Sequence, residues 1–364
     1  MRLSELIKFL EELAPLQYQE SYDNSGLLYG NPNRKITKAL ISLDCTEEVV
    51  NEAIKKKCDL IVSHHPLIFG GISSLTGKNY VERTFIKAIQ KDIALYAIHT
   101  NLDNVKAGVN AKITQKLGMK DCQILTPKKG LLKKLITFCP AEKVGKVRAA
   151  IFEAGAGNIS DYSECSFNSE GYGTFKGNEG TDPVVGVKGK QNQESEIKIE
   201  SIFPKHSEGK ILEALFHSHP YEEVAYDIIP LDNQHKMIGS GMIGLLHKEM
   251  DEKAFLKKIK TTMRCKSIRY TALRKKKVKT VAVCGGSGSF LLADAIRNKA
   301  DFLITADFKY HQFFDAEGKI VIADIGHYES EQFTKDLLYD LINKKFPKFA
   351  LRLSEINTNP INYY

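Results

Sequence analysis

The chain has 364 residues, 43% of them hydrophobic, and its 52 basic and 44 acidic residues give a formal net charge of +8. This length predicts two or three domains with real hydrophobic cores. The charge is too mild to indicate a nucleic-acid-binding protein by itself, and no run approaches the roughly 18 apolar residues of a membrane span.

The seven cysteines are scattered and include no C-x-x-C pair, which indicates reduced thiols. The amino terminus, residues 1–13, is amphipathic at the helical period and carries acids, unlike a signal or transit peptide. The sequence therefore predicts a soluble, cytoplasmic protein that does not bind membranes.

After this opening helix, the first 130 residues alternate between strands and helices. The predicted strands and helices, in chain order, cover residues 39–44, 46–57, 60–63, 81–91 and 93–98. Strands that alternate with helices predict β-α-β units and a mainly parallel sheet flanked by helices.

The strand over residues 60–63 stops at His64, His65 and Pro66. Because proline cannot continue a strand ladder, the histidines should lie just past the carboxyl end of a buried strand, where open α/β sheets bind ligands. Two neutral imidazoles would offer two metal-ligand nitrogens there. The dipeptide alone fits an ordinary pair of turn histidines at least as well.

The strand over residues 93–98 delivers a second pair, His99 and, four residues later, Asp103. Asp103 could cap the helix that follows, which is a common role for aspartate. The spacing also suits two ligands of one site. These residues alone leave the two interpretations even.

From about residue 131 the pattern changes to two halves with antiparallel character. Residues 191–203 alternate at period two, as a half-buried antiparallel strand does. We predict an inserted α+β ferredoxin-like domain over residues 131–272. It interrupts a two-part α/β core domain formed by residues 1–130 and 273–364.

Two features near this insert each allow two interpretations. His217 and His219 could bind metal, but Pro220 directly after them favours a turn. The basic run at residues 274–277 favours a solvated linker, with a nucleic-acid patch as the alternative.

Beyond that linker we expect a strand over residues 279–284 and a glycine-rich loop over residues 285–289. Such a loop before a helix could cradle a phosphate or carboxylate, or it could serve close packing of the helix on the sheet. It completes neither a Walker A motif nor a dinucleotide fingerprint.

Two further strands end in polar residues. The strand over residues 301–305 leads to Asp307 and His311, and His311 could carry protons or be an ordinary loop histidine. The strand over residues 319–325 leads to His327, and Glu331 lies four residues later on the same helical face. One metal ion could therefore be held by both.

Three buried strands from distant parts of the chain thus end in histidine or in histidine plus carboxylate, which favours a metal site over structural histidines. Histidine and carboxylate without cysteine favour zinc, iron, manganese or nickel. The set exceeds what one tetrahedral ion needs. We therefore predict two divalent ions per chain, about 3.5–4 Å apart, bridged by a carboxylate and sharing a water nucleophile.

Four motifs together resemble one known family. They are Ser-His-His-Pro at 63–66, His-Thr-Asn-Leu-Asp at 99–103, Thr-Ala-Asp at 305–307 and Gly-His-Tyr-Glu-Ser-Glu at 326–331. The chain resembles the dinuclear-metal-centre family of NIF-three-like proteins, also called GTP cyclohydrolase 1 type 2 homologues, in its long bacterial form. The resemblance implies a homohexameric ring with the metal sites facing an internal cavity, and an insert related to PII and CutA proteins.

The resemblance also implies a ligand set and an ion. The implied metal ligands are His64, His65, Asp103, His327 and Glu331, with Glu331 or Asp103 as the bridge. His99 would then lie beside the site. Zinc is the ion we expect a crystal to hold.

Three functions fit these observations. The first is a metal-dependent hydrolase of a C–N or phosphoester bond, and the resemblance implies opening of the GTP ring with formate release, with His99 and His311 as candidate catalytic residues. The alternative is a non-catalytic, metal-loaded ring that binds nucleic acid or a regulatory partner. The third is metal storage, which five committed ligands with built-in carboxylates disfavour.

Overall fold

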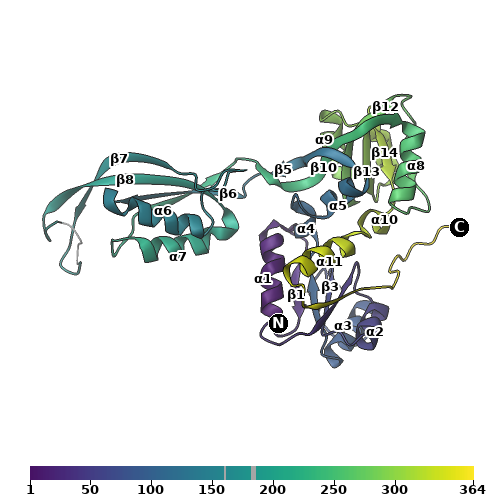
Figure 1. Ribbon diagram of the computed structural model, residues 1–364, viewed down its shortest axis with the longest axis horizontal. Helices are drawn as coiled ribbons and strands as arrows, with labels where there is room; N and C mark the ends of the chain where they lie inside the picture. Colours follow the sequence, from purple (N-terminus) through teal and green to yellow (C-terminus); the bar gives the residue numbers. More distant parts are fainter. Residues whose placement is uncertain (160, 182–185) are drawn as a thin grey trace. The chain divides into compact units, whose positions relative to one another are not determined.

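The computed structural model describes residues 1–159, 161–181 and 186–364. The chain forms two compact units. The core unit combines Met1–Thr126 with Met237–Tyr364, and the insert unit spans Pro127–Lys236 (Figure 1). Among the described residues, no helix combines the length and the apolar character needed to cross a membrane. All seven cysteines are free thiols.

The first sheet of the core unit has five strands. Across the sheet they follow the order β1 (Gly26–Tyr29), β4 (Ala94–Ala97), β3 (Leu60–Ser63), β2 (Lys38–Ser42) and β15 (Ala350–Leu353). β1 is antiparallel to β4, and all other neighbours are parallel. Every residue of β3 and β4 is buried, as expected of parallel strands that are covered on both faces.

Helices cover both faces of this sheet. They are α1 (Leu3–Leu13), α2 (Glu47–Lys55), α3 (Tyr80–Gln90) and α11 (Thr334–Lys345). Helices α2 and α3 lie together on one face, with α1 and α11 on the other (Figure 1). In α1 the buried residues Leu3, Leu6 and Leu10 recur at three and four positions, so they form one apolar face. The predicted mixed α/β class, with helices flanking a mainly parallel sheet, is confirmed.

The second sheet of the core unit has six strands. Their order is β11 (Arg269–Tyr270), β14 (Val321–Asp324), β13 (Phe302–Ala306), β12 (Lys277–Ser287), β10 (His235–Asp251) and β5 (Met119–Lys128). The central strands β14, β13 and β12 are parallel, whereas β10 is antiparallel to β12 and β11 is antiparallel to β14. The carboxyl ends of the parallel strands therefore share one edge.

The compact units differ from the predicted domains over residues 237–272, which the sequence placed in the insert. In the structure, β10 pairs with β12 over residues 242–251. The helix that follows, α8 (Glu252–Thr262), packs on the same sheet, with the rings of Phe255 and Phe302 5.1 Å apart. A strand pattern in the sequence does not tell which sheet the strand joins, which explains the difference.

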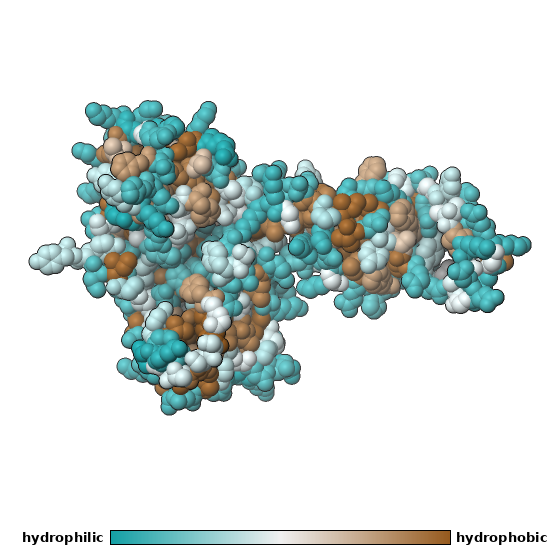
Figure 2. Space-filling model, turned by 180° about the vertical axis from the view of Figure 1, so that it is seen from behind, coloured by the Kyte–Doolittle hydropathy of each residue, from teal (hydrophilic) through white to brown (hydrophobic). Residues whose placement is uncertain are grey.

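The insert unit has the element order β-α-β-β-α-β, the order of a split β-α-β module. Its elements are β6 (Leu132–Cys139), α6 (Val144–Glu153), β7 (Phe167–Lys176), β8 (Gln191–Pro204), α7 (Glu208–Ser218) and β9 (Tyr226–Leu231). The strands form an antiparallel sheet in the order β7, β8, β6, β9. Buried Phe203, Ile151 and Leu215 join its helices to its sheet. Figure 2 shows apolar residues among hydrophilic ones on the surface of this unit.

Glu52, buried on α2, holds the chain segment that follows β15, and Glu52→Gln should destabilise the protein. Its carboxylate accepts hydrogen bonds from the Ser354 side chain, from the Glu355 N–H at 3.0 Å and from Lys56 at 2.7 Å. Burial alone would raise the pKa of Glu52, but these hydrogen bonds outweigh burial and lower it. The stabilisation is therefore complete above about pH 4.5 and is lost as the pH falls through the lowered folded-state pKa.

At pH 7 we expect Glu52→Gln to lower the free energy of unfolding by about 1–3 kcal/mol, measured by urea denaturation. The difference from the unaltered chain should shrink as the pH falls below about 4. The matched control is Glu12→Gln on α1, whose exposed side chain should change stability by less than about 0.5 kcal/mol. Equal stability of the Glu52 variant and the unaltered chain at pH 7 would contradict this role.

Candidate metal centre

The ends of β3 and β4 supply one half of a cluster of polar side chains. β3 is followed at once by His64 and His65, and β4 leads through His99 into the short helix α4 (Thr100–Asn104), which carries Asp103. Because the two strands are parallel neighbours, their carboxyl ends lie at the same edge of the sheet.

The short helix α10 (His327–Glu331) supplies the other half, directly after β14 of the second sheet. Its first and last residues lie one helical turn apart and on one face. Gly326 precedes it with a φ of +93°, and a Cβ there would lie 2.3 Å from an oxygen of Glu329. Glycine therefore fits this turn, which sets the direction of α10.

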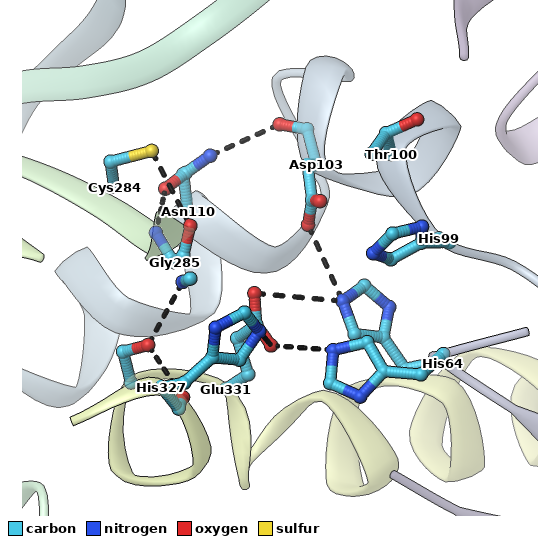
Figure 3. Close-up of polar contacts among 12 residues, drawn as sticks. His64, His99, Thr100, Asp103, Asn110, Cys284, Gly285, His327 and Glu331 are labelled. Atoms are coloured by element: carbon cyan, nitrogen blue, oxygen red, sulfur yellow. Dashed lines mark hydrogen bonds and ion pairs between the residues drawn. The ribbon is translucent and has the colours of Figure 1, made fainter. Parts of the chain in front are cut away.

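The carboxylate of Glu331 lies at the centre of the cluster (Figure 3). One oxygen, Oε2, lies 2.9 Å from Nε2 of His65 and 3.1 Å from Nε2 of His327. The other oxygen, Oε1, lies 3.8 Å from Nε2 of His64. Asp103 approaches the same His64 nitrogen at 3.6 Å. The structure thus brings together all five residues that the family resemblance implies as metal ligands.

Two atoms of this cluster test whether a metal ion fits. Nε2 of His64 and Oδ1 of Asp103 are buried, and neither has a hydrogen-bond partner in the described part of the chain. Their separation of 3.6 Å exceeds a hydrogen bond, and buried polar atoms without partners are costly. A cation between them would satisfy both. Three groups of residues could each hold a metal ion, because the ligand atoms within a group lie within 4.8 Å of one another. The groups are His64, Asp103 and Glu331; His65, His327 and Glu331; and His64, His65 and His99.

The charges and burial of the cluster raise the pKa values of three of these residues and lower that of Glu331. Burial, followed by the charge of Glu331, raises the pKa of Asp103 to about 8. Burial opposes the charged form of His65, but hydrogen bonds to its two carboxylate partners outweigh burial and raise its pKa to about 10. Burial also opposes the charged form of His327, but the negative charge of Glu331 and the hydrogen bonds to Asp307 and Glu331 outweigh burial and raise the pKa of His327 to about 11. Burial would raise the pKa of Glu331, but its histidine neighbours hold it well below its usual value.

Each histidine of the cluster is oriented by a partner at its Nδ1. For His64 this is the carbonyl oxygen of Ile98, at 2.8 Å. For the other three it is a carboxylate at 2.6–2.7 Å: Asp44 behind His65, Asp23 behind His99 and Asp307 behind His327. Such partners fix which nitrogen faces a metal. Sequence reasoning did not assign these carboxylates, although Asp44 and Asp307 also follow the ends of buried strands.

The glycine-rich segment that we expected to be a loop forms the end of β12 up to Ser287, and it packs against the cluster. A Cβ on Gly286 would lie 2.5 Å from Oε1 of Glu331. The N–H groups of Gly285 and Gly286 donate to the side chains of Asn110 and Ser330, at 3.0 and 2.9 Å. Both are therefore engaged within the chain, which favours close packing over an anion cradle.

The cluster lies in a cavity of about 620 Å³, lined by both parts of the core unit. His65, His99 and His327 line it, and the ring of His99 lies 5.3 Å from those of His64 and His65. His311 is exposed on the 3₁₀ segment Tyr310–Ala316 and is not among the lining residues.

His217 and His219 belong to the insert unit, and their ring nitrogens form hydrogen bonds within that unit. His217 Nδ1 lies 2.8 Å from the Glu213 carbonyl oxygen. His219 Nε2 lies 2.9 Å from the Phe138 carbonyl oxygen, and its Nδ1 accepts the Tyr221 N–H. His217 thus lies in the last turn of α7, and His219 directly follows that helix.

Known proteins resemble this chain over its full length. The family model Duf34/NIF3 (NGG1p interacting factor 3) matches residues 1–360. A Halalkalibacterium halodurans protein named GTP cyclohydrolase 1 type 2 homolog is 38% identical, and the match covers 98% of each chain. The crystal structure of a Bacillus cereus protein related to NIF3 superposes with a TM-score of 0.86 at 35% identity, covering 100% of this chain and 99% of that one. A Staphylococcus aureus crystal structure gives 0.79 at 32% identity, with the same coverage.

Proposed function

Because the chain belongs to the Duf34/NIF3 family, we propose that it binds two divalent metal ions and acts as a metal-dependent hydrolase. The observation that carries this proposal is the position of Glu331 between two sets of ligands. His64 and Asp103 lie on the side of one oxygen, and His65 and His327 on the side of the other. Glu331 is in both sets and Asp103 in one, which favours Glu331 as the bridge.

The donor set of histidine and carboxylate suits zinc, iron, manganese or nickel. When bound, such ions supply Lewis acidity and lower the pKa of water. The residues of the chain orient the ligands and shield two of them from water. Asp44 and Asp307 hold His65 and His327 with Nε2 toward Glu331. Glu331 and His64 are buried, which keeps bulk water from these two ligands.

His99 is the proton carrier we favour within this site. Its Nδ1 lies 2.7 Å from Asp23, which leaves Nε2 as the nitrogen that can take or give a proton. It lines the cavity next to His65. Asp23 itself accepts from the Thr100 N–H and side chain, and so is fixed in place.

The bond we propose to be cleaved is a C–N bond of a ring compound. The name of the Halalkalibacterium halodurans relative supplies GTP as the first substrate to test. Hydrolysis of one C–N bond would open the ring of GTP, and hydrolysis of the second C–N bond of the same carbon would release that carbon as formate, which would match that name. The test is elemental analysis of protein purified without added metal, followed by a formate assay with GTP on the same sample. About two ions per chain with formate release would support the proposal, and absence of bound metal would overturn it.

Replacing His99 with glutamine should separate metal binding from catalysis. We expect His99→Gln to retain the metal content of the unaltered chain and to lose about a hundredfold or more in kcat, because a positioned proton carrier contributes about 10²–10⁴-fold. His311→Gln is the matched control, since His311 is exposed and outside the cavity lining. If the His311 variant lost activity and the His99 variant did not, the two assignments would have to be exchanged.

We also propose that the protein is a cytoplasmic homohexamer. Family membership supports the assembly, and seven free thiols agree with a reducing compartment. Light scattering should give a mass near six times the 40.8 kDa of one chain. The nucleic-acid alternative gains little from the basic run, because Arg274 pairs with Asp301 and Lys277 with Asp251.

A further inference from the structure

We propose that the cavity binds a planar heteroaromatic compound of low negative charge, held by an aromatic rim, in preference to a nucleoside triphosphate. This inference rests on the proposed function, because it names the class of substrate that would reach the same site. It is carried by the aromatic side chains of the cavity, by its charge and by its volume.

Four aromatic side chains line the cavity and are also strongly exposed. We call Tyr22, Phe69, Tyr80 and Phe290 the aromatic rim, and their exposed fractions are 67%, 53%, 61% and 65%. The ring of Phe69 lies 5.6 Å from that of His99, so the rim reaches the metal-ligand cluster. Large aromatic groups that are left in water around a cavity mark a ligand site, because a flat ring can stack on them.

The charge of the cavity disfavours a triphosphate. Among the described residues that line it there is no lysine or arginine, while Glu20, Asp44, Asp103 and Glu331 are acidic. Two divalent ions would match these four carboxylates and leave no excess positive charge. Phosphate sites in proteins use arginine, lysine, free backbone N–H groups or metal ions, and here the charge of the two ions is already matched by the carboxylates.

Backbone donors at the end of β12 do not replace the missing cations. This glycine-rich segment forms part of the cavity wall, and its N–H groups would suit a phosphate. Two of them, those of Gly285 and Gly286, already donate to Asn110 and Ser330. A volume of about 620 Å³ lies within the range of about 300–1,000 Å³ typical of small-molecule sites. A bicyclic ring with a small substituent meets these conditions better than a polyanion does.

The test is calorimetric titration of the metal-loaded full chain with guanosine, with pterin and with GTP at physiological salt. We expect guanosine or pterin to bind at least as tightly as GTP. Phe69→Ala and Phe290→Ala should each weaken binding of that compound by roughly five- to a hundredfold, as loss of a stacking ring does. Phe216→Ala is the matched control, because Phe216 is 47% exposed but lies in the insert unit, and it should leave the Kd unchanged.

Several results would overturn this inference. GTP binding more than tenfold tighter than both uncharged compounds would show that phosphates dominate, and unchanged affinity in both rim variants would exclude stacking. Failure of guanosine and pterin to bind at all would also count against it. If the rim variants change the mass of the assembly in light scattering, the rim is a surface between copies of the chain instead.

Metal content and formate release, measured on the same samples, keep this test separate from the proposed function. If the rim variants weaken binding but the protein holds no metal or releases no formate, the inferred ligand class is supported and the proposed hydrolase function is overturned. If the protein releases formate from GTP but the rim variants bind normally, the hydrolase function is supported and the inferred ligand class is overturned.

Discussion

Glu331→Gln should remove both metal ions from the protein. Its two carboxylate oxygens face different ligand sets, so a single amide disturbs both. Loss of an outer partner of a metal ligand costs about 10–100-fold in affinity, and loss of a shared ligand should cost more at each position. Elemental analysis after extensive dialysis should find less than about a tenth of the metal of the unaltered chain.

Two further variants make this result specific. Asp103→Asn touches the set with His64 but not the set with His327, so it should reduce the content from about two ions to about one. Glu329→Gln lies on the same short helix and is equally buried, but Glu329 bonds to Asn359 and is in none of the candidate sets. Its metal content should be unchanged. Full metal content in the Glu331 variant would refute the bridging role.

Metal affinity should fall steeply as the pH is lowered. In the metal-free protein His65, His327 and Asp103 have pKa values of about 10, 11 and 8, so at neutral pH all three are mainly protonated. Each must lose its proton before it can serve as a ligand. Binding should therefore release two to three protons per chain, and the association constant should drop by about a hundredfold to a thousandfold for each pH unit between about 8 and 6.

Calorimetry in buffers of different ionisation enthalpy would count these protons directly. Asp103→Asn, which removes one titrating ligand, should lower the number released by about one. A proton count near zero at pH 7 would mean that the histidines are already neutral before the metal arrives, which contradicts the raised pKa values.

The sequence predicted the features that depend on local pattern. The buried runs that end in His64, His99 and His327 were recognised as strands, and parallel strands gather their carboxyl ends. It did not assign the carboxylates behind the histidines, because Asp23, Asp44 and Asp307 meet them only through the fold. The strand β7 was also missed, since Gly171 and Gly173 weaken a strand pattern that pairing with β8 nevertheless supports.

The position of β10 marks a second limit of the sequence. The sequence did not predict this strand, and its pairing with β12 places it in the second sheet of the core unit. The predicted boundary at residue 272 relied on the basic run that follows. In the structure that run is tied down by Glu252, which accepts the N–H groups of Arg274 and Lys275.

His65 and Glu331 are 266 positions apart along the chain, which bears on how the protein is made. During synthesis four of the five strands of the first sheet, β1 to β4, are made long before α10, so an early chain holds only part of the ligand set. Bringing the two parts together has a loop-closure cost that the ions would repay. Metal capture should therefore occur last and distinguish finished molecules from chains that stop short.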